Sequence, residues 1–291
     1  SNGYSSITAK VKMYLFNAST NDWNRMGRHL IKLENGKWSS VDVLTSSKTN
    51  ASQQNYYVAL GSSDYSQGDR YGLARLHGYD HFRNEWSQIG EDVNCYVSTS
   101  DGGGKLAQFL STDVSLGVLN DSIMLAVSCP GTGSSYHQQK VSGMAYMYRY
   151  DTTTTEMSTP EYFGDLSDPI ENARVGDLTG FRVRLSKDSK RLAVLSSSSN
   201  AGGGMIGIFD LNDAKDGYVQ SGENIVGDKA SSIASSDIIV GGRIGLSIDI
   251  SGDDIVFGTT ANSNEGFYRI YGKTSANLNA DIEDDYYDDQ G

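Results

Sequence analysis

Few stretches of this 291-residue chain resemble a metal-binding motif. The stretch Asp249–Asp254, with the sequence DISGDD, comes nearest to a calcium-binding loop. It has too few carboxylates in alternation, because calcium takes about six to eight oxygen ligands. We expect a solvated hairpin turn there, with no bound metal and no cofactor.

Neither the histidines nor the glycine runs form a recognisable catalytic or phosphate-binding motif. The four histidines are scattered, without metal-ligand spacing or a nearby nucleophile motif: His29, His77, His81 and His137. The runs Gly102–Gly104 and Gly202–Gly204 are not followed by Lys-Ser or Lys-Thr, as a phosphate loop would be. We therefore expect flexible links at the glycines and no catalytic residue in the chain.

Negative charge is concentrated at the C-terminal end. The net charge is −12, and six acidic residues lie between Asp281 and Asp289 without a basic residue. An acidic body repels phosphate backbones, so we expect no nucleic-acid partner. The tail combines aromatic and acidic side chains, and we expect it to dock on a partner through these residues: Asp284, Asp285, Tyr286, Tyr287, Asp288 and Asp289.

The two cysteines, Cys95 and Cys129, are too few for a disulfide framework or a zinc site. We expect two half-buried free thiols, with a disulfide bridge as the alternative. The longest apolar run is too short to span a membrane. The chain begins without Met, which is consistent with a processed mature form in an organelle such as a plastid, or with secretion.

One strand type recurs along the chain and ends in an aromatic residue followed by Asp or Asn. The copies that carry the acid are Tyr79-Asp80, Tyr150-Asp151 and Phe209-Asp210. We expect Asp80, Asp151 and Asp210 to end their strands by bonding the local backbone into a turn. A second strand follows, and Trp23 and Trp86 occupy matching places in its two clearest copies.

A hairpin pattern completes each repeat. In Phe181–Leu185 apolar residues alternate with polar ones, and after the polar turn Lys187–Lys190 comes the apolar run Leu192–Leu195. The same plan recurs at Leu246–Gly258. Tandem units of four short strands are typical of a β-propeller.

These patterns predict an all-β, propeller-like array of about four to five four-stranded antiparallel units, either open or completed by a neighbour. The predicted units cover residues 9–71, 72–142, 143–203 and 204–265, with a closing strand at 266–272. They make up a repeat domain at 1–272, followed by an acidic tail at 273–291. The N-terminal strand pair is left over, and unpaired strand edges recruit other chains.

The segments Glu85–Val93, Val183–Val194 and Ile250–Gly258 resemble the integrin-type, FG-GAP-like β-propeller repeats, in a divergent form similar to those of microalgae. The resemblance implies a propeller fold and says little about activity. From it and the unpaired edges we expect a non-enzymatic structural protein, a homo-oligomer or the partner of another protein, in a coat or shell such as that of the pyrenoid. The alternative is an extracellular ligand-binding or adhesion propeller that uses calcium. A hydrolase on a propeller scaffold is a further candidate, without a visible nucleophile.

Overall fold

The structure is a computed structural model, and it describes twelve stretches of the chain. They are residues 9–33, 38–47, 54–67, 70–96, 112–130, 143–151, 161–165, 179–196, 204–226, 243–252, 254–260 and 266–271. Every regular element in these stretches is a β-strand, which confirms the all-β class. The described residues contain no helix of the length and hydropathy that a membrane span needs.

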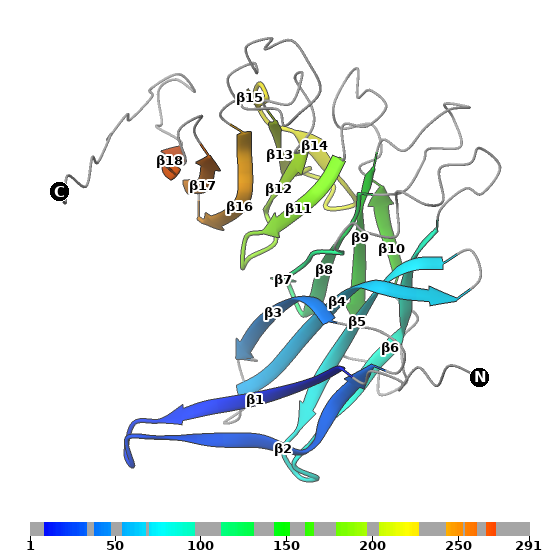
Figure 1. The fold of residues 1–291 in the computed structure, drawn as a ribbon, viewed down its shortest axis with the longest axis vertical. Helices are drawn as coiled ribbons and strands as arrows, with labels where there is room; N and C mark the ends of the chain where they lie inside the picture. Colours follow the sequence, from blue (N-terminus) through cyan, green and yellow to red (C-terminus); the bar gives the residue numbers. More distant parts are fainter. Residues whose placement is uncertain are drawn as a thin grey trace, which may run out of the picture.

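The strands form an N-terminal hairpin and four antiparallel sheets, which Figure 1 shows in chain order. The hairpin consists of β1 (Ala9–Asn17) and β2 (Asp22–Leu33). The first sheet contains β3 (Trp38–Ser47), β4 (Gln54–Gln67), β5 (Arg70–Asp80) and β6 (Glu85–Tyr96). The second contains β7 (Val114–Leu119), β8 (Ser122–Cys129), β9 (Met144–Asp151) and β10 (Glu161–Asp165).

The last two sheets differ in their number of strands. The third contains β11 (Thr179–Leu185), β12 (Arg191–Ser196), β13 (Met205–Leu211) and β14 (Tyr218–Gln220), and β15 (Ile225–Val226) also pairs with β13. The fourth contains β16 (Arg243–Ser251), β17 (Asp254–Thr260) and β18 (Gly266–Tyr271). Neither β1 nor β2 pairs with β18. The propeller-like array is therefore open.

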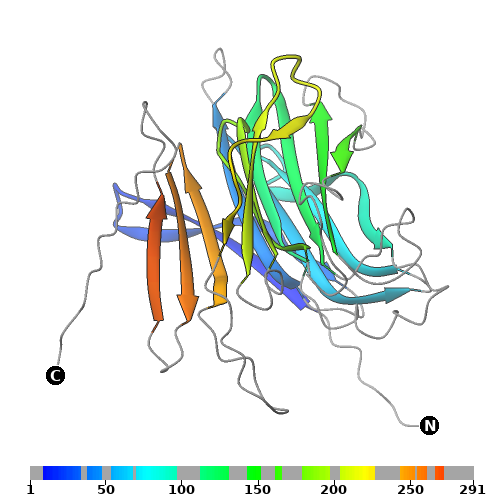
Figure 2. The same cartoon turned by 90° about the horizontal axis from the view of Figure 1, so that it is seen from above.

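Each sheet packs face to face on the next, and Figure 2 shows the four sheets side by side. One apolar cluster fills each of the three seams between consecutive sheets. Leu116 and Leu125 lie in the first seam, Leu185 and Phe209 in the second, and Phe257 in the third. The central strands are buried on both faces, which explains why β8 and β12 are nearly continuous apolar runs.

The sheets do not coincide with the repeats of the sequence, so our expectation that each repeat forms one sheet is wrong. The first sheet spans Trp38–Tyr96, and β4 pairs with β5 across the expected boundary between residues 71 and 72. Each complete sheet takes the last two strands of one repeat and the first two of the next. The left-over N-terminal pair, β1 and β2, does form a separate two-stranded sheet, as expected. The division into a body at 1–272 and a tail at 273–291 stays a prediction, because the tail lies outside the described residues.

A disulfide bridge joins Cys95 of β6 to Cys129 of β8, which corrects our expectation of free thiols. Both residues are buried, and their Cα atoms are 5.6 Å apart. The sequence alone could not bring them together, because they lie on different sheets and 34 residues apart. Closing a loop of this length stabilises a fold by about 3–4 kcal/mol. The bridge therefore fastens the first seam.

Candidate functional site

The first strands of consecutive sheets lie next to one another, and side chains link them. The amide of Leu116 in β7 donates to Asp42 Oδ2 of β3 at 2.7 Å. The amide of Leu185 in β11 donates to Ser115 Oγ of β7 at 3.0 Å, in the same manner. Each of these strands is at the edge of its own sheet, so a polar side chain of the preceding sheet satisfies an N–H that would otherwise stay unpaired.

A buried ion pair strengthens the link between β7 and β11. The Asp113 carboxylate accepts hydrogen bonds from the Val183 amide at 3.2 Å and from Arg184 Nη1 at 2.6 Å. Burial raises the pKa of Asp113, and the charges of Arg184 and Arg182 oppose this rise. Because Arg184 pairs with Asp113, its guanidinium is engaged at this seam.

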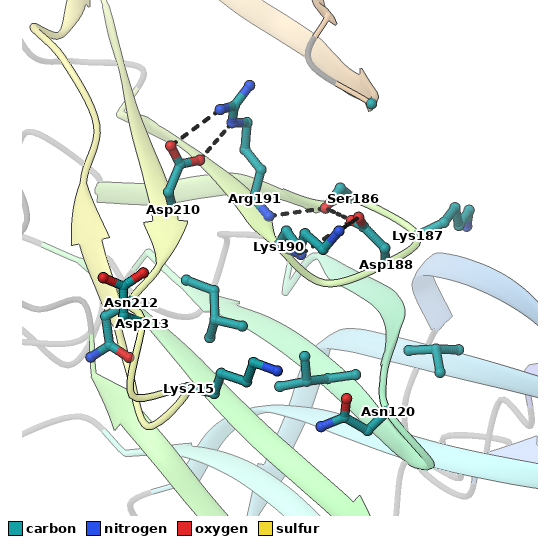
Figure 3. Close-up of a pocket in the computed structure, with 14 residues that line it drawn as sticks. Asn120, Ser186, Lys187, Asp188, Lys190, Arg191, Asp210, Asn212, Asp213 and Lys215 are labelled. Atoms are coloured by element: carbon teal, nitrogen blue, oxygen red, sulfur yellow. Dashed lines mark hydrogen bonds and ion pairs between the residues drawn. The ribbon is translucent and has the colours of Figure 1, made fainter.

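The links bring several hairpin turns to one end of the array, where a cavity of about 1000 Å³ opens between them. Figure 3 shows its lining, which comes from the β7–β8, β11–β12 and β13–β14 turns and from Gly252 after β16. Val118, Leu119 and Leu211 supply the apolar part of the wall. The amide of Val118 donates to the Lys187 carbonyl at 2.8 Å, which fixes the β7 and β11 turns against each other.

The β11–β12 turn is held rigid by its own polar groups. Asp188 Oδ1 accepts hydrogen bonds from Ser186 Oγ at 2.8 Å and from the Lys190 amide at 3.2 Å. The Lys190 ammonium lies 3.2 Å from Asp188 Oδ2. Partial burial acts to raise the pKa of Asp188, but the hydrogen bonds from Ser186 and Lys190 and the Lys190 charge outweigh it and lower the pKa. Asp188 is therefore a carboxylate that stabilises the turn.

A second carboxylate of the lining, Asp210, is also occupied. Arg191 binds it through Nε at 2.7 Å and Nη2 at 3.1 Å, a two-point contact that Figure 3 shows. The Arg191 side chain is only 9% exposed. A paired guanidinium this deeply buried is a structural element of the wall.

Three polar side chains of the lining, in contrast, have no hydrogen-bond or ion-pair partner among the described residues. Asn120 lies in the β7–β8 turn, whereas Asp213 and Lys215 lie in the β13–β14 turn. Figure 3 shows the Lys215 side chain extending into the pocket in the direction of Asn120. Asn120 and Lys215 both adopt positive φ, 54° and 58°, because their turns reverse sharply. An amide, a carboxylate and an ammonium therefore face the cavity with hydrogen-bonding capacity to spare.

The charge of the lining differs in sign from that of the whole chain. Four basic side chains, Lys187, Lys190, Arg191 and Lys215, stand against Asp188, Asp210 and Asp213, which gives +4 − 3 = +1. The whole chain carries −12. The pocket is thus a place where a hydroxyl-rich ligand, neutral or singly anionic, meets both donors and acceptors.

The residues expected from the repeats lie at other places in the fold. Asp80 accepts the Phe82 and Arg83 amides at 2.8 and 3.1 Å, in the β5–β6 turn. Asp151 lies at the end of β9. Asp210 binds the Arg191 side chain. The turn after β13 is instead closed by Asn212, two residues further along, whose side-chain oxygen accepts the Asp216 amide at 3.2 Å.

The two tryptophans occupy the same register in their hairpins, since Trp23 lies opposite Phe16 and Trp86 lies opposite Tyr79. Their surroundings differ. Trp23 is 63% exposed, whereas Trp86 Nε1 donates to the Met26 carbonyl at 3.2 Å and its ring packs on the first sheet. The expected docking residues Asp284–Asp289 lie outside the described residues.

Within the stretches that the structure describes, no three His, Cys, Asp or Glu side chains gather as a metal ligand set. The absence of a bound metal or cofactor stays a prediction. The sequence patterns indicated an ordinary turn at Lys187–Lys190 and did not assign Asn120, Asp213 or Lys215 to a binding site. The only local signal was the polar composition of three turns, which does not show that they converge.

Comparison with known proteins gives remote structural likenesses only. No family model and no curated protein matches the chain, so the resemblance to FG-GAP-like repeats is not confirmed. An endo-arabinase from Bacteroides thetaiotaomicron is 14% identical with a TM-score of 0.37, over 79% of this chain and 72% of that one. A putative 6-phosphogluconolactonase from Bacteroides uniformis is 13% identical with a TM-score of 0.38, over 95% and 77%. A structure titled glycoside hydrolase is 11% identical with a TM-score of 0.37, over 79% and 69%.

These findings correct the expected function. The similar structures carry the names of enzymes, which contradicts a non-enzymatic coat or shell protein with an adhesion propeller as the alternative. We keep neither. TM-scores below 0.5 carry no argument about the chemistry of this chain, so a function has to be argued from its own residues. A homo-oligomeric state or a protein partner stays a prediction.

Proposed function

We propose that the chain is a carbohydrate-directed protein whose pocket at the hairpin turns binds a short saccharide. The observation that carries the proposal is the set of uncommitted groups on the pocket wall, Asn120, Asp213 and Lys215, around a cavity of about 1000 Å³. A sugar hydroxyl both donates and accepts hydrogen bonds. It can therefore pair with an amide, a carboxylate and an ammonium at once.

The size and the rigidity of the pocket fit this ligand class. Small-molecule sites have volumes of about 300–1,000 Å³ and combine apolar wall with a few fixed polar groups. Here the turns that carry these groups are held by other contacts: the Val118 amide donates to the Lys187 carbonyl beside the β7–β8 turn, and the Asn212 side chain accepts the Asp216 amide in the β13–β14 turn. A pocket organised before binding loses little conformational entropy when the ligand enters.

The described lining supports binding and does not by itself define a reaction. Glycoside hydrolysis uses two carboxyl groups, one of which has a raised pKa and acts as the acid. Asp213 is an exposed carboxylate that could serve as a base. The pKa of Asp188 is lowered, and Asp210 is paired with Arg191. We therefore propose that these residues bind a saccharide. Whether the protein also hydrolyses it is tested in the same experiment.

The test is calorimetric titration with neutral and uronic-acid di- and trisaccharides, with product analysis of the same mixtures. We expect Asp213→Asn and Lys215→Asn to weaken binding about tenfold each, the loss typical of one hydrogen bond to a charged group. Asparagine at position 215 tolerates the positive φ of that residue. The matched control is Asp254→Asn, an exposed carboxylate outside the lining. Equal affinities of wild type and both pocket variants would rule the proposal out.

A further inference from the structure

The β1–β2 hairpin has an outward face with an unusual composition. This face combines basic and aromatic residues, and we call them the hairpin platform: Lys10, Lys12, Tyr14, Phe16, Trp23 and Arg25. The register places Trp23 opposite Phe16 and Arg25 opposite Tyr14, so the six side chains share one face. Val11 and Met13, on the other face, pack against the first sheet.

The platform is open to solvent although it is rich in apolar surface. Tyr14, Phe16 and Trp23 are 47%, 44% and 63% exposed, and the three basic residues are exposed as well. The Phe16 and Trp23 rings lie 5.2 Å apart at 56°. Figure 1 shows that the tip of the hairpin projects beyond the first sheet. Exposed aromatic groups gathered in this way mark an interaction surface.

The platform carries no carboxylate among its described side chains, in a chain of net charge −12. Asp22 faces the opposite side with Asn17, and its Oδ1 accepts the Trp23 amide at 2.7 Å. Lys10 and Lys12 place two positive charges on one face of an acidic protein, which makes this face complementary to an anion. The aromatic rings beside these charges offer an apolar surface on which the C–H faces of sugar rings can stack.

We propose that the hairpin platform binds an acidic polysaccharide, with the rings stacked on sugar units and the basic side chains paired with their carboxylates. The proposal rests on the proposed function and deepens it, because it specifies the saccharide as part of an acidic polymer. The pocket would then hold a short stretch or an end of a polymer that the platform retains.

Two observations favour a polysaccharide over a single-stranded nucleic acid, which also combines charge with stackable rings. The body of the chain is acidic outside the platform, so a densely charged phosphate backbone is repelled more strongly than a polyuronate. The Cys95–Cys129 bridge is typical of proteins in oxidising compartments, which favours an extracellular type of polymer.

The test measures the binding of the whole chain to four immobilised polymers by biolayer interferometry. Polygalacturonate carries sugar rings and carboxylates, polyglutamate carries carboxylates alone, dextran carries sugar rings alone, and oligothymidine carries bases and phosphates. We expect polygalacturonate to bind most tightly and to weaken as salt increases. Tighter binding of polyglutamate would assign the platform to an acidic peptide, and tighter binding of oligothymidine to a nucleic acid. Either result would overturn the proposal.

Two variants separate the rings from the charges. Phe16→Ala with Trp23→Ala, and Lys10→Gln with Lys12→Gln, should each weaken polygalacturonate binding about tenfold, as hot-spot truncations do. The matched control is Phe82→Ala with Arg83→Ala, an exposed ring and an exposed cation on the β5–β6 turn. Unchanged binding of the lysine variant, whose substitutions lie on the surface and leave the fold intact, would also overturn the proposal.

The proposal about the pocket and the proposal about the hairpin platform can be contradicted independently of each other. If the proposed function is wrong, the pocket variants bind trisaccharides as wild type does, whatever the platform does with the polymer. If the proposal about the hairpin platform is wrong, Asp213→Asn still lowers the affinity for trisaccharides, but the platform variants bind polygalacturonate with the affinity of wild type.

Discussion

His77 is a titratable side chain that ties the stability of the first sheet to pH. It lies in β5 and is only 6% exposed. Burial and, to a smaller extent, the Arg75 charge lower the pKa of His77 to about 4, against the opposing effect of the Asp92 charge. The imidazole is therefore neutral in the folded protein near pH 6, where the unfolded chain already takes up a proton.

The unfolding free energy should fall as the pH decreases from about 6.5 to about 4, by roughly 3 kcal/mol from this group alone. The contribution is fully present above 6.5, because both states are then neutral. His77→Gln should flatten the pH dependence in that window, as measured by urea unfolding at several pH values. His81→Gln, in the β5–β6 turn, is the control. An unchanged slope in the His77 variant would show that His77 titrates normally.

Asp113 is a second buried ionisable residue, and it forms an ion pair with Arg184. Asp113→Ala removes the acceptor of the Val183 amide and leaves Arg184 without its carboxylate. Breaking a buried pair in this way costs about 3–5 kcal/mol. Arg83→Ala breaks a pair on the surface and should change stability by less than about 1 kcal/mol. Chemical denaturation of both variants checks the contrast, and equal effects would contradict the assignment of Asp113 to the seam.

At the scale of elements, the approach of β7 to β11 depends on a residue without a side chain. A Cβ on Gly117 would lie 2.6 Å from the Ser186 carbonyl oxygen. Gly117→Ala should therefore separate the two turns and destabilise the fold by about 1–3 kcal/mol, as overpacking does. At Gly217, where a Cβ would meet Asn212 at an ordinary 3.7 Å, the same change should have little effect. Thermal melting of the two alanine variants distinguishes them.

The Gly117 variant also connects the fold to the site. Because Ser186 begins the turn that lines the pocket, moving it should weaken saccharide binding, even though Gly117 does not line the cavity. The Gly217 variant should bind as wild type does.

Strands could be predicted from the sequence more completely than their grouping into sheets. The alternation in Phe181–Leu185 and the apolar run Leu192–Leu195 predict β11 and β12, because each pattern is local. The chain is a succession of hairpins, and the same local patterns fit any division of it into groups of four strands. Pairings such as that of Val58 with His77 are needed to show that β4 and β5 belong to the same sheet.

The pocket could not be predicted for a related reason. Asn120, Lys187 and Lys215 come from three turns that are separated by the length of whole strands. Nothing in the composition of a polar turn indicates which other turn it will face. The seam interactions that bring the turns together, such as the bond from Leu116 to Asp42, depend on which sheets are neighbours.

At the scale of the whole molecule, the array is open and its seams carry the stability. The Cys95–Cys129 bridge fastens the first seam, whereas no disulfide is seen among the described residues of the other two. Cys95→Ala with Cys129→Ala should lower the unfolding free energy by about 3–4 kcal/mol. Wild type in reducing buffer should approach the variant, as measured by denaturation with and without reductant. A variant as stable as the oxidised wild type would contradict this role.

The open array leaves the pocket at one end of the sheets and the hairpin platform on the face of β1 and β2 that points away from the first sheet. Both depend on the seams, because the pocket wall joins turns of neighbouring sheets and the hairpin rests on β6 through the bond from Trp86 to Met26. Loosening a seam should therefore affect ligand binding and stability together.

The central claim is that a saccharide binds between the β7–β8 and β13–β14 turns. The most direct measurement is a crystal structure of the protein with a uronic-acid trisaccharide. The account predicts sugar density within hydrogen-bonding distance of Asn120, Asp213 and Lys215, which disappears in the combined Asp213→Asn and Lys215→Asn variant. Saccharide density elsewhere on the molecule, with the pocket empty at saturating ligand, would contradict it.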